Sequence, residues 1–306
     1  MKKEQSKTPQ TGGVIIIDKC EGMTSHDVVD RVRKLYGTKR VGHTGTLDPM
    51  ATGVLVVLVE RAAKAAEYLV CDEKRYEAIL RLGLTTDTGD TSGKTLTEST
   101  DIPNEKAVLE TVSSFVGKQE QVPPMYSALK KDGVKLVDLA RKGIEIEREA
   151  RPIEVFSIEA KKITDTDYSL SVHCSKGTYI RTLCTDIGEK LGCGGCMSAL
   201  RRTMSGGFSI ENAHTLEEVG ALTEEERNAL LMPTEALFAD CPAVTLKPFF
   251  AHLAHSGNEI YQAKIGTDFP LDTVVRLCDE HGFFALAKAA MFEGGTALKP
   301  IKQFAI

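Results

Sequence analysis

The sequence predicts an α+β protein, with a large mixed-sheet domain followed by a small all-β module. Three observations support this prediction. The 306 residues exceed the usual size of one domain, so two domains are the first expectation. Strand and helix patterns follow each other irregularly, which argues against the regular βαβ order of a doubly wound fold. After about Val244 the pattern changes to short strands around a glycine-rich turn.

The first part of the chain predicts a strand, a helix and a second strand. Residues 1–12 are polar and lack the apolar segment of a signal peptide, so we expect a disordered tail and a cytoplasmic protein. The isoleucine-rich residues 13–19 indicate a buried strand. Ser25 is placed to cap a helix that ends at Gly37, and the VLVVLV of residues 54–59 indicates a strand buried on both faces.

The middle of the chain adds strands, helices and one irregular segment. Residues 75–83 alternate as a strand with one buried face, and residues 105–116 indicate a helix. Residues 123–152 combine prolines, charges and a short apolar helical core, so we expect an excursion from the sheet. Residues 168–174 alternate as a further strand, and residues 177–192 carry apolar side chains at helical spacing.

Charge is distributed unevenly along the chain. The net charge is −5, but residues 211–240 alone carry −7, which leaves +2 for the rest. On charge alone, the basic clusters fit either solvated helix faces or a surface that follows a phosphate backbone. No apolar run approaches the roughly 20 residues that cross a bilayer, so no membrane partner is expected. The clustered basic residues are Arg31, Arg33, Lys34, Lys39, Arg40, Lys176, Arg181, Arg201 and Arg202.

The eight cysteines are scattered over a chain that has its own apolar core, so free thiols fit better than a disulfide framework. Cys193 and Cys196 have the spacing of metal ligands. A structural zinc site needs two more ligands, and no second CxxC or nearby HxxxH supplies them. The sequence therefore predicts no metal, and it contains no motif for a cofactor.

Asp48 lies in a glycine-rich loop just before the apolar strand at residues 54–59. An Asp-Pro pair is common in turns, so a capped turn is the simplest interpretation. The loop lacks the GxxxxGK[ST] pattern of phosphate loops, the GxSxG of serine hydrolases and the second carboxylate of glycosidases. What remains is a single carboxylate presented beside His43.

Five stretches together resemble the bacterial tRNA pseudouridine-55 synthases of the TruB type. They are DKCEGMTSHDVV, GHTGTLDPMATGVLVV, KRYEAILRLGLTTDTGD, VPPMYSALKKDGVKLVDLARKG and HCSKGTYIRTLCTDIGEKLG. The match runs from Gly13 to Gly207, and the final GTALKPIKQF is similar to the end of the PUA-like module often attached to these enzymes. Cys20 stands where the family usually has proline, a departure that concerns the rigidity of that turn and not the chemistry.

The resemblance implies a catalytic domain over residues 13–243, an insertion at about 123–152 that closes over the RNA, and a PUA-like RNA-binding domain over residues 244–306. It implies isomerisation of uridine 55 in the tRNA T-loop, in which uracil is detached from ribose, turned and rejoined through C5. It also implies tRNA as the partner, without a cofactor or a guide RNA, and we expect a monomer. The basic clusters then become candidate RNA contacts.

By resemblance, Asp48 is the nucleophile and Arg181 is its ion-pair partner. We expect this arginine to depress the pKa of Asp48 and to keep the carboxylate ionised. Tyr76 matches the aromatic residue that stacks on the flipped base, although the bare pattern also fits a core tyrosine. His43 matches the residue that fills the vacated stack, where a loop histidine capping its own turn is the simpler interpretation.

Three further residues complete the candidate site. Tyr179 matches a hydrogen-bonding pocket residue, and Leu200 matches an apolar wall, for which simple core packing is nearly as good an interpretation. Lys64 is a candidate contact for backbone phosphate or a carboxylate. Attack on the ribose C1′ and attack on the uracil ring are both compatible with these residues.

Two other functions share part of this pattern. An RNA-binding or tRNA-folding module with little turnover would use the same basic surface and β-rich tail. It has no need of a carboxylate facing a polyanion, so Asp48, Tyr76 and Arg181 favour the enzyme. A synthase directed by a separate guide RNA fits less well with the long segment at residues 123–152.

Overall fold

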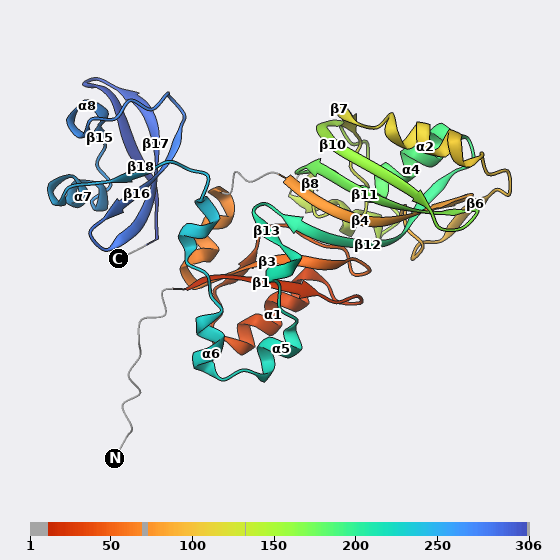
Figure 1. Ribbon diagram of the computed structural model, residues 1–306, viewed down its shortest axis with the longest axis horizontal. Coiled ribbons are helices and arrows are strands. Elements are labelled where there is room, and N and C mark those ends of the chain that lie inside the picture. The colour runs from red at the N-terminus through yellow and green to blue at the C-terminus, as the bar shows by residue number, and fades with distance from the viewer. Residues whose placement is uncertain (1–11, 69–72, 132, 305–306) are drawn as a thin grey trace, which may run out of the picture.

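The computed structural model describes residues 12–68, 73–131 and 133–304, which form a larger and a smaller lobe (Figure 1). Apart from Gly12, the tail expected at residues 1–12 lies outside the described residues. The predicted α+β class is confirmed. The larger lobe is built on a nine-stranded sheet of β1 (Gly13–Lys19), β2 (Val41–His43), β3 (Thr52–Val59), β4 (Glu73–Leu82), β7 (Gly117–Gln121), β10 (Arg151–Lys162), β11 (Asp167–Ser175), β12 (Gly195–Ser205) and β13 (Phe208–Ser209).

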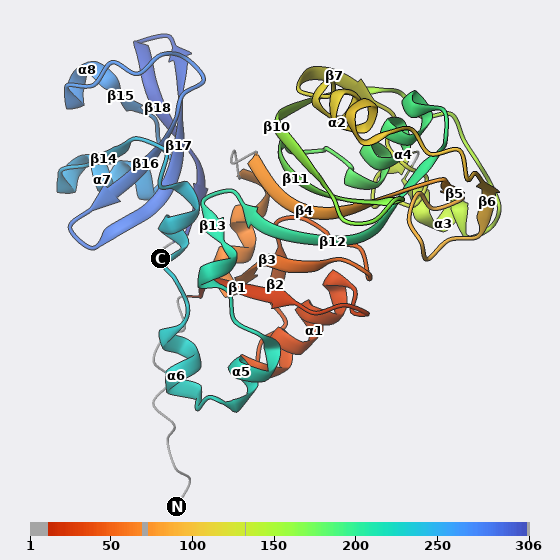
Figure 2. The ribbon, with the colours of Figure 1, turned by 45° about the vertical axis from the view of Figure 1, so that its right-hand side comes forward.

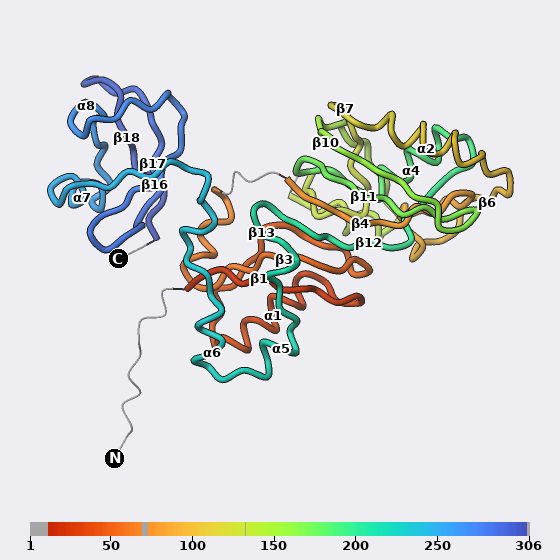
Figure 3. Tube along the Cα trace, in the orientation of Figure 1, coloured from red at the N-terminus to blue at the C-terminus, as the bar shows by residue number. Residues whose placement is uncertain are grey.

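The order of the large sheet places a late strand at its centre. The main order is β1-β3-β12-β4-β11-β10-β7, with β2 beside β3 and β13 beside β12. Figure 3 shows the same crossing, with β12 running between the much earlier β3 and β4. β12 pairs with β4 along most of its length, but it meets β3 only at Arg201 and Arg202. A Cβ on Gly53 would lie 2.2 Å from the Arg202 carbonyl oxygen, so only glycine permits this close junction.

Helix α1 (Ser25–Leu35) begins one residue earlier than expected. Thr24, not Ser25, is the N-cap, and it forms a capping box with Asp27. The predicted cap at Ser25 is therefore wrong. Ser25 is buried instead, and its hydroxyl accepts a hydrogen bond from the Leu47 N–H at 2.8 Å and donates to the Leu47 carbonyl at 3.1 Å. A tertiary contact thus decided between two neighbouring residues that can both cap a helix.

Helices cover one face of the β4-β11-β10 part of the sheet. They are α2 (Glu105–Ser113) and α4 (Ile180–Leu191), and they pack on β10 and β12 (Figure 2). The alternation predicted for the neighbouring strands is confirmed, because one side of each strand faces these helices. The buried residues on β4 and β11 are Tyr76, Ala78, Leu80, Leu82, Tyr168, Leu170, Val172 and Cys174.

Between β7 and β10 the chain leaves the large sheet, as expected. This insertion, residues 122–150, contains the two-stranded pair β8 (Lys130–Lys131) and β9 (Val134–Lys135) and the short helix α3 (Leu136–Ala140). Pro152, which we expected in the excursion, already belongs to β10. A second projection, the hairpin of β5 (Leu84–Thr86) and β6 (Thr95–Glu98), lies between β4 and α2 in the chain.

The smaller lobe is rich in strands, as predicted, but it also holds two unexpected helices. Its sheet has the order β14 (Ala243–Thr245), β16 (Val274–Asp279), β17 (Gly282–Phe292), β18 (Gly295–Gln303) and β15 (Ile260–Tyr261). The helices are α7 (Pro248–His255) and α8 (Gln262–Ile265). Both are too short to show a clear helical period in the sequence.

The two lobes share an apolar cluster. Leu286 and Phe304 of the smaller lobe pack with Val14, Leu58 and Phe238 of the larger one. The elements at this junction include η1 (Glu60–Tyr68) and η3 (Thr234–Phe238), and the rest of the acidic segment forms η2 (Ile210–Asn212), α5 (Leu216–Ala221) and α6 (Glu224–Ala229). No helix in the described part of the chain is long and apolar enough to cross a membrane.

Candidate active site

Asp48 and Arg181 are brought together at the centre of the larger lobe. Asp48 lies in the loop between β2 and β3, and Arg181 is the second residue of α4. The Arg181 Nε lies 2.9 Å from Asp48 Oδ2, and its Nη2 lies 3.3 Å from Oδ1. The Asp48 side chain keeps 34% of its surface exposed, whereas that of Arg181 keeps 6%. The carboxylate is therefore open to a ligand, and the arginine supports it from behind.

Arg181 is held by more than one partner. Its Nη1 donates to the Thr88 carbonyl at 3.0 Å, and its Nη2 donates to the Tyr126 carbonyl at 2.6 Å. Thr88 lies between β5 and β6, and Tyr126 lies in the insertion. The guanidinium thus joins the Asp48 loop to both projections of the lobe, which fixes its orientation.

Arg181 lowers the pKa of Asp48, as predicted, but the net shift of that pKa is upward. Burial raises the pKa of Asp48 above its ordinary value, and the charges of Arg181 and Lys19 only oppose this rise. The buried Asp90 adds to it by repulsion. Desolvation of the carboxylate therefore outweighs its ion pair.

Asp90 is a site residue that the sequence reasoning missed. Its Oδ2 lies 3.7 Å from Arg181 Nη1, so the arginine sits between two carboxylates. Its Oδ1 accepts hydrogen bonds from the Thr88 hydroxyl at 2.9 Å and from the Ser92 N–H at 3.0 Å. The residues TTDTGDTSGK predict a polar turn-rich loop, and nothing in that local pattern indicates that one of its aspartates points inward.

Buried side chains from three other elements hold the Asp48 loop, here residues 45–49, through its backbone. Arg202 donates to the carbonyls of residues 45 and 46, at 3.0 and 3.4 Å. Ser25 binds both the N–H and the carbonyl of residue 47. Lys19 donates to the carbonyl of residue 49 at 3.2 Å, and the Asp48 carbonyl accepts from Ala51 within the turn. All five carbonyls are bound, so the loop is rigid before any substrate arrives.

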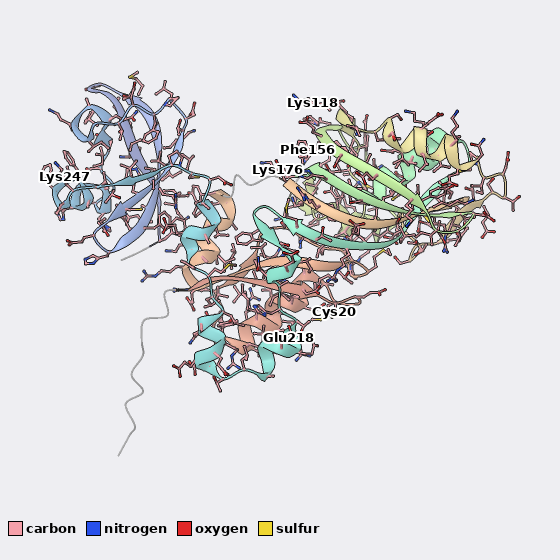
Figure 4. All side chains as sticks on the ribbon, viewed as in Figure 1. Cys20, Lys118, Phe156, Lys176, Glu218 and Lys247 are labelled. Atoms are coloured by element: carbon pink, nitrogen blue, oxygen red, sulfur yellow. The ribbon has the colours of Figure 1, made fainter. Side chains whose placement is uncertain are left out.

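Lys19 is the second residue that the sequence reasoning missed. It ends β1 and is fully buried, and its Nζ donates to the carbonyls of Cys20 and Met23 as well as Pro49. Burial lowers the pKa of Lys19 below its ordinary value. Cys20 itself is exposed, as Figure 4 shows. Cys20 replaces the proline that is usual in this turn, and Lys19 fixes the turn instead by binding these carbonyls.

Three expected pocket residues lie around Asp48. Tyr76 and Leu200 are buried in one apolar cluster with Leu47 and Ala51, the residues that flank the Asp48 turn. Burial raises the pKa of Tyr76. Tyr179 directly precedes α4, and its backbone exchanges two hydrogen bonds with Gln121, at 2.8 and 3.1 Å.

His43 lies on β2, five residues before Asp48. Its Nδ1 is buried without a hydrogen-bond partner among the described residues, so the side chain does not cap its own turn through this atom. Burial, and then the charge of Arg202, lower the pKa of His43, which favours the neutral imidazole. Lys64 is exposed on η1 and shares no hydrogen bond with the Asp48 loop within the described chain.

The basic clusters divide into exposed and buried members. Arg181 and Arg202 are 5% and 1% exposed, so they are not available to phosphates, contrary to the expectation from charge. Arg201 is paired with Asp18 at 2.7 Å. The members that are exposed near the loop before β2 are Arg31, Lys34, Lys39 and Arg40.

Cys193 and Cys196 are buried free thiols. Burial raises the pKa of Cys196 to about 11. Among the residues that the structure describes, no group of three or more His, Cys, Asp or Glu side chains is arranged to hold a metal ion.

The fold as a whole gives the class of protein. It matches the crystal structure of a Cbf5-Nop10-Gar1 complex with a TM-score of 0.75 and 28% identity, over 96% of this chain and 85% of that one. It matches an H/ACA RNP bound to a substrate RNA containing 2′-deoxyuridine with a TM-score of 0.74 and 26% identity, over 97% and 86% of the two chains. With the paired aspartate and arginine at its centre, this is the fold of a pseudouridine synthase.

The chain belongs to the TruB family of pseudouridylate synthases. Residues 33–180 match the N-terminal domain of that family, and residues 181–239 match the tRNA pseudouridylate synthase B C-terminal domain. The tRNA pseudouridine synthase B of Syntrophotalea carbinolica is 45% identical over 77% of this chain and 78% of its own length. The enzyme of the same name from Azoarcus sp. (strain BH72) is 44% identical over 86% of this chain and 88% of its own length. The one from Clostridium tetani is 41% identical over 90% of this chain and 95% of its own length.

Proposed function

We propose that this protein isomerises uridine 55 in the T-loop of tRNA to pseudouridine, with Asp48 as the nucleophile. The observation that carries the proposal is the Asp48 carboxylate, which is accessible, paired with the buried Arg181 at 2.9 Å and located in a loop whose carbonyls are all bound. The relatives named tRNA pseudouridine synthase B support the substrate. The reaction is an isomerisation, so it needs no external group or electron.

The pocket residues account for the steps that such a reaction requires. The uridine must leave the T-loop stack, which costs a few kcal/mol, and a neutral His43 is suited to replace it among the bases. The Tyr76 ring and Leu200 offer apolar contact to the flipped base. Asp48 then forms a bond to the substrate, the N1–C1′ glycosidic bond breaks, and uracil turns and rejoins ribose through C5. The bond to Asp48 is released, C5 loses its proton and N1 gains one, so the product is an isomer of uridine. Arg181 holds the carboxylate in position throughout.

The T-arm backbone would be held by basic side chains outside the pocket. Arg40 and Lys64 are exposed on the side of β2 and η1, and Lys130, Lys131 and Lys135 lie in the insertion. Such contacts set affinity, while the T-loop shape and the flipped base set selectivity. We propose that the chain does this as a monomer and without a guide RNA.

The test is incubation of the purified chain with an unmodified tRNA transcript, followed by mapping of pseudouridine. We expect one pseudouridine, at position 55, without any added RNA or protein. Asp48→Asn is the matched control, because it is nearly isosteric and removes only the carboxylate; it should bind the transcript within a few-fold of the unchanged protein and give no product. Modification at another position, or modification only after addition of a second RNA, would contradict the proposal.

A further inference from the structure

Arg202 is the largest fully buried side chain among the described residues, at 1% exposure. It lies on β12, at the point where this strand meets β3. The other arginines of this region have carboxylate partners, Asp48 for Arg181 and Asp18 for Arg201, but Arg202 forms no ion pair with any described residue. A buried guanidinium without a carboxylate is costly, so its hydrogen bonds must compensate for lost water.

The hydrogen-bond partners of Arg202 lie in two separate parts of the pocket. Its Nε donates to the Val54 carbonyl on β3 at 2.7 Å, and its two terminal nitrogens donate to the carbonyls of Gly45 and Thr46 in the Asp48 loop. Tyr76 lies directly opposite Arg202 in the pairing of β4 with β12, so the two side chains are neighbours on one face of the sheet. The charge of Arg202 lowers the pKa of the Tyr76 phenol, against the larger effect of burial.

We propose that Arg202 is a positioning residue for the reaction, which ties the Asp48 loop to β3 and so fixes the carboxylate against the Tyr76 ring on β4. The inference rests on the proposed roles of Asp48 and Tyr76. The planar guanidinium has five N–H donors in a fixed fork, and here its three nitrogens bind the carbonyls of residues 45, 46 and 54. A misplacement of about 1 Å between two such groups can cost roughly 100-fold in rate.

The first test is Arg202→Lys, measured by single-turnover pseudouridine formation and by tRNA binding. The ammonium keeps the charge but presents its donors from a single point, so it cannot replace the fork that spans the loop and β3. We expect the rate constant to fall by about 10- to 100-fold while the tRNA Kd changes less than threefold. Arg81→Lys is the matched control, since Arg81 also uses its fork in the large sheet, but on Asp167 at 2.8 and 2.9 Å. It should leave the rate constant unchanged.

A double-mutant cycle with Ser25→Ala separates positioning of the loop from general support of the fold. Because Ser25 holds residue 47 of the same loop, the combined effect of Arg202→Lys and Ser25→Ala on the rate constant should differ from the product of their separate effects. Strictly multiplicative effects, or full activity of Arg202→Lys, would overturn the proposal.

Amide hydrogen exchange gives a test that does not depend on activity. Arg202→Lys should speed the exchange of the amides of the Asp48 loop, since two carbonyls of this loop lose their partner, whereas Arg81→Lys should leave the exchange unchanged. Unchanged exchange in Arg202→Lys would mean that Arg202 does not hold the loop, whatever the reaction of the protein. Absence of pseudouridine in the unchanged protein would instead overturn the proposed function and leave this structural result standing.

Discussion

Arg181 shows why one residue type is needed at this site. Its guanidinium contacts Asp48, the Thr88 carbonyl and the Tyr126 carbonyl at once. A lysine ammonium presents its donors from a single point, so it cannot keep the two-point contact with Asp48 together with both carbonyls. Arg181→Lys should therefore slow pseudouridine formation by roughly 100-fold or more. Single-turnover assays at saturating protein would measure this. Turnover at the original rate would show that Arg181 does not orient the carboxylate.

The burial of Asp48 gives a prediction for pH. Burial raises the pKa of Asp48, and only the ionised carboxylate can attack. Because the proton is held more tightly than in a solvent-exposed aspartate, activity should fall as the pH drops through this raised pKa. The acidic limb of the single-turnover rate should therefore begin at a higher pH than an ordinary aspartate would give. An acidic limb at or below the ordinary pKa of an aspartate would show that the charge of Arg181 outweighs burial of the carboxylate.

Glu60 has a left-handed backbone, with φ at 55°, which is unfavourable for a residue with a side chain. Its carboxylate contacts the Thr38 hydroxyl and lies 3.7 Å from Arg40, and its N–H donates to the Arg40 carbonyl. Glu60→Ala removes the side-chain contacts and keeps the backbone cost, whereas Glu60→Gly removes both. We expect the glycine variant to be more stable than the alanine variant by about 1 kcal/mol, measured by urea unfolding. Equal stabilities would argue against backbone strain.

Among the elements, α1 offers two adjacent residues with different tasks. Thr24 caps the helix, while Ser25 holds Leu47 beside Asp48. Thr24→Ala should therefore cost about 1 kcal/mol of stability and leave turnover unchanged. Ser25→Ala should lower turnover as well, since it frees one point of the Asp48 loop. Denaturant unfolding and single-turnover rates on both variants would check this, and equal turnover in the two would contradict it.

The elements that could be predicted from the sequence are those with a strong local pattern. The apolar runs of β1 and β3 and the alternation of β4 appear where expected. The site was predicted only as far as the resemblance reached, so Asp48 and Arg181 were found together, with their roles still to be tested. Lys19 and Asp90 were missed, and Arg202 was predicted only as part of a basic surface, because their partners around Asp48 lie far away in sequence. No local pattern encodes such a partner.

At the scale of the whole molecule, the smaller lobe is joined to the larger one by an apolar contact. A chain that ends at Asp240 would lack the smaller lobe and would expose Leu58 and Phe238, which pack with Phe304. A truncated chain should therefore lose solubility, yet retain pseudouridine formation on an isolated T-arm stem-loop, because the proposed catalytic residues lie in the larger lobe. A folded truncation that is inactive on the stem-loop would place the smaller lobe in the catalytic unit.

The smaller lobe should contribute little to the salt dependence of tRNA binding. Four of its basic residues, Arg276, Lys288, Lys299 and Lys302, already pair with carboxylates, which leaves Lys247 and Lys264 for phosphates. Figure 4 shows Lys247 at the outer side of this lobe. Replacing both lysines by alanine should reduce the slope of log K against log salt by about two at most. A larger change would mean that the ion pairs open on binding.

The central place of β12 also has a consequence for how the protein is made. While the ribosome is still adding residues after Leu82, the inner edges of β3 and β4 have been synthesised, but the strand that joins them has not. Unpaired edges of this kind invite contact with other nascent chains, and the long wait for a distant partner slows folding. Leu200 and Arg202 arrive with β12 itself, so the pocket that we assign to uridine closes late in synthesis, after every other wall has been made.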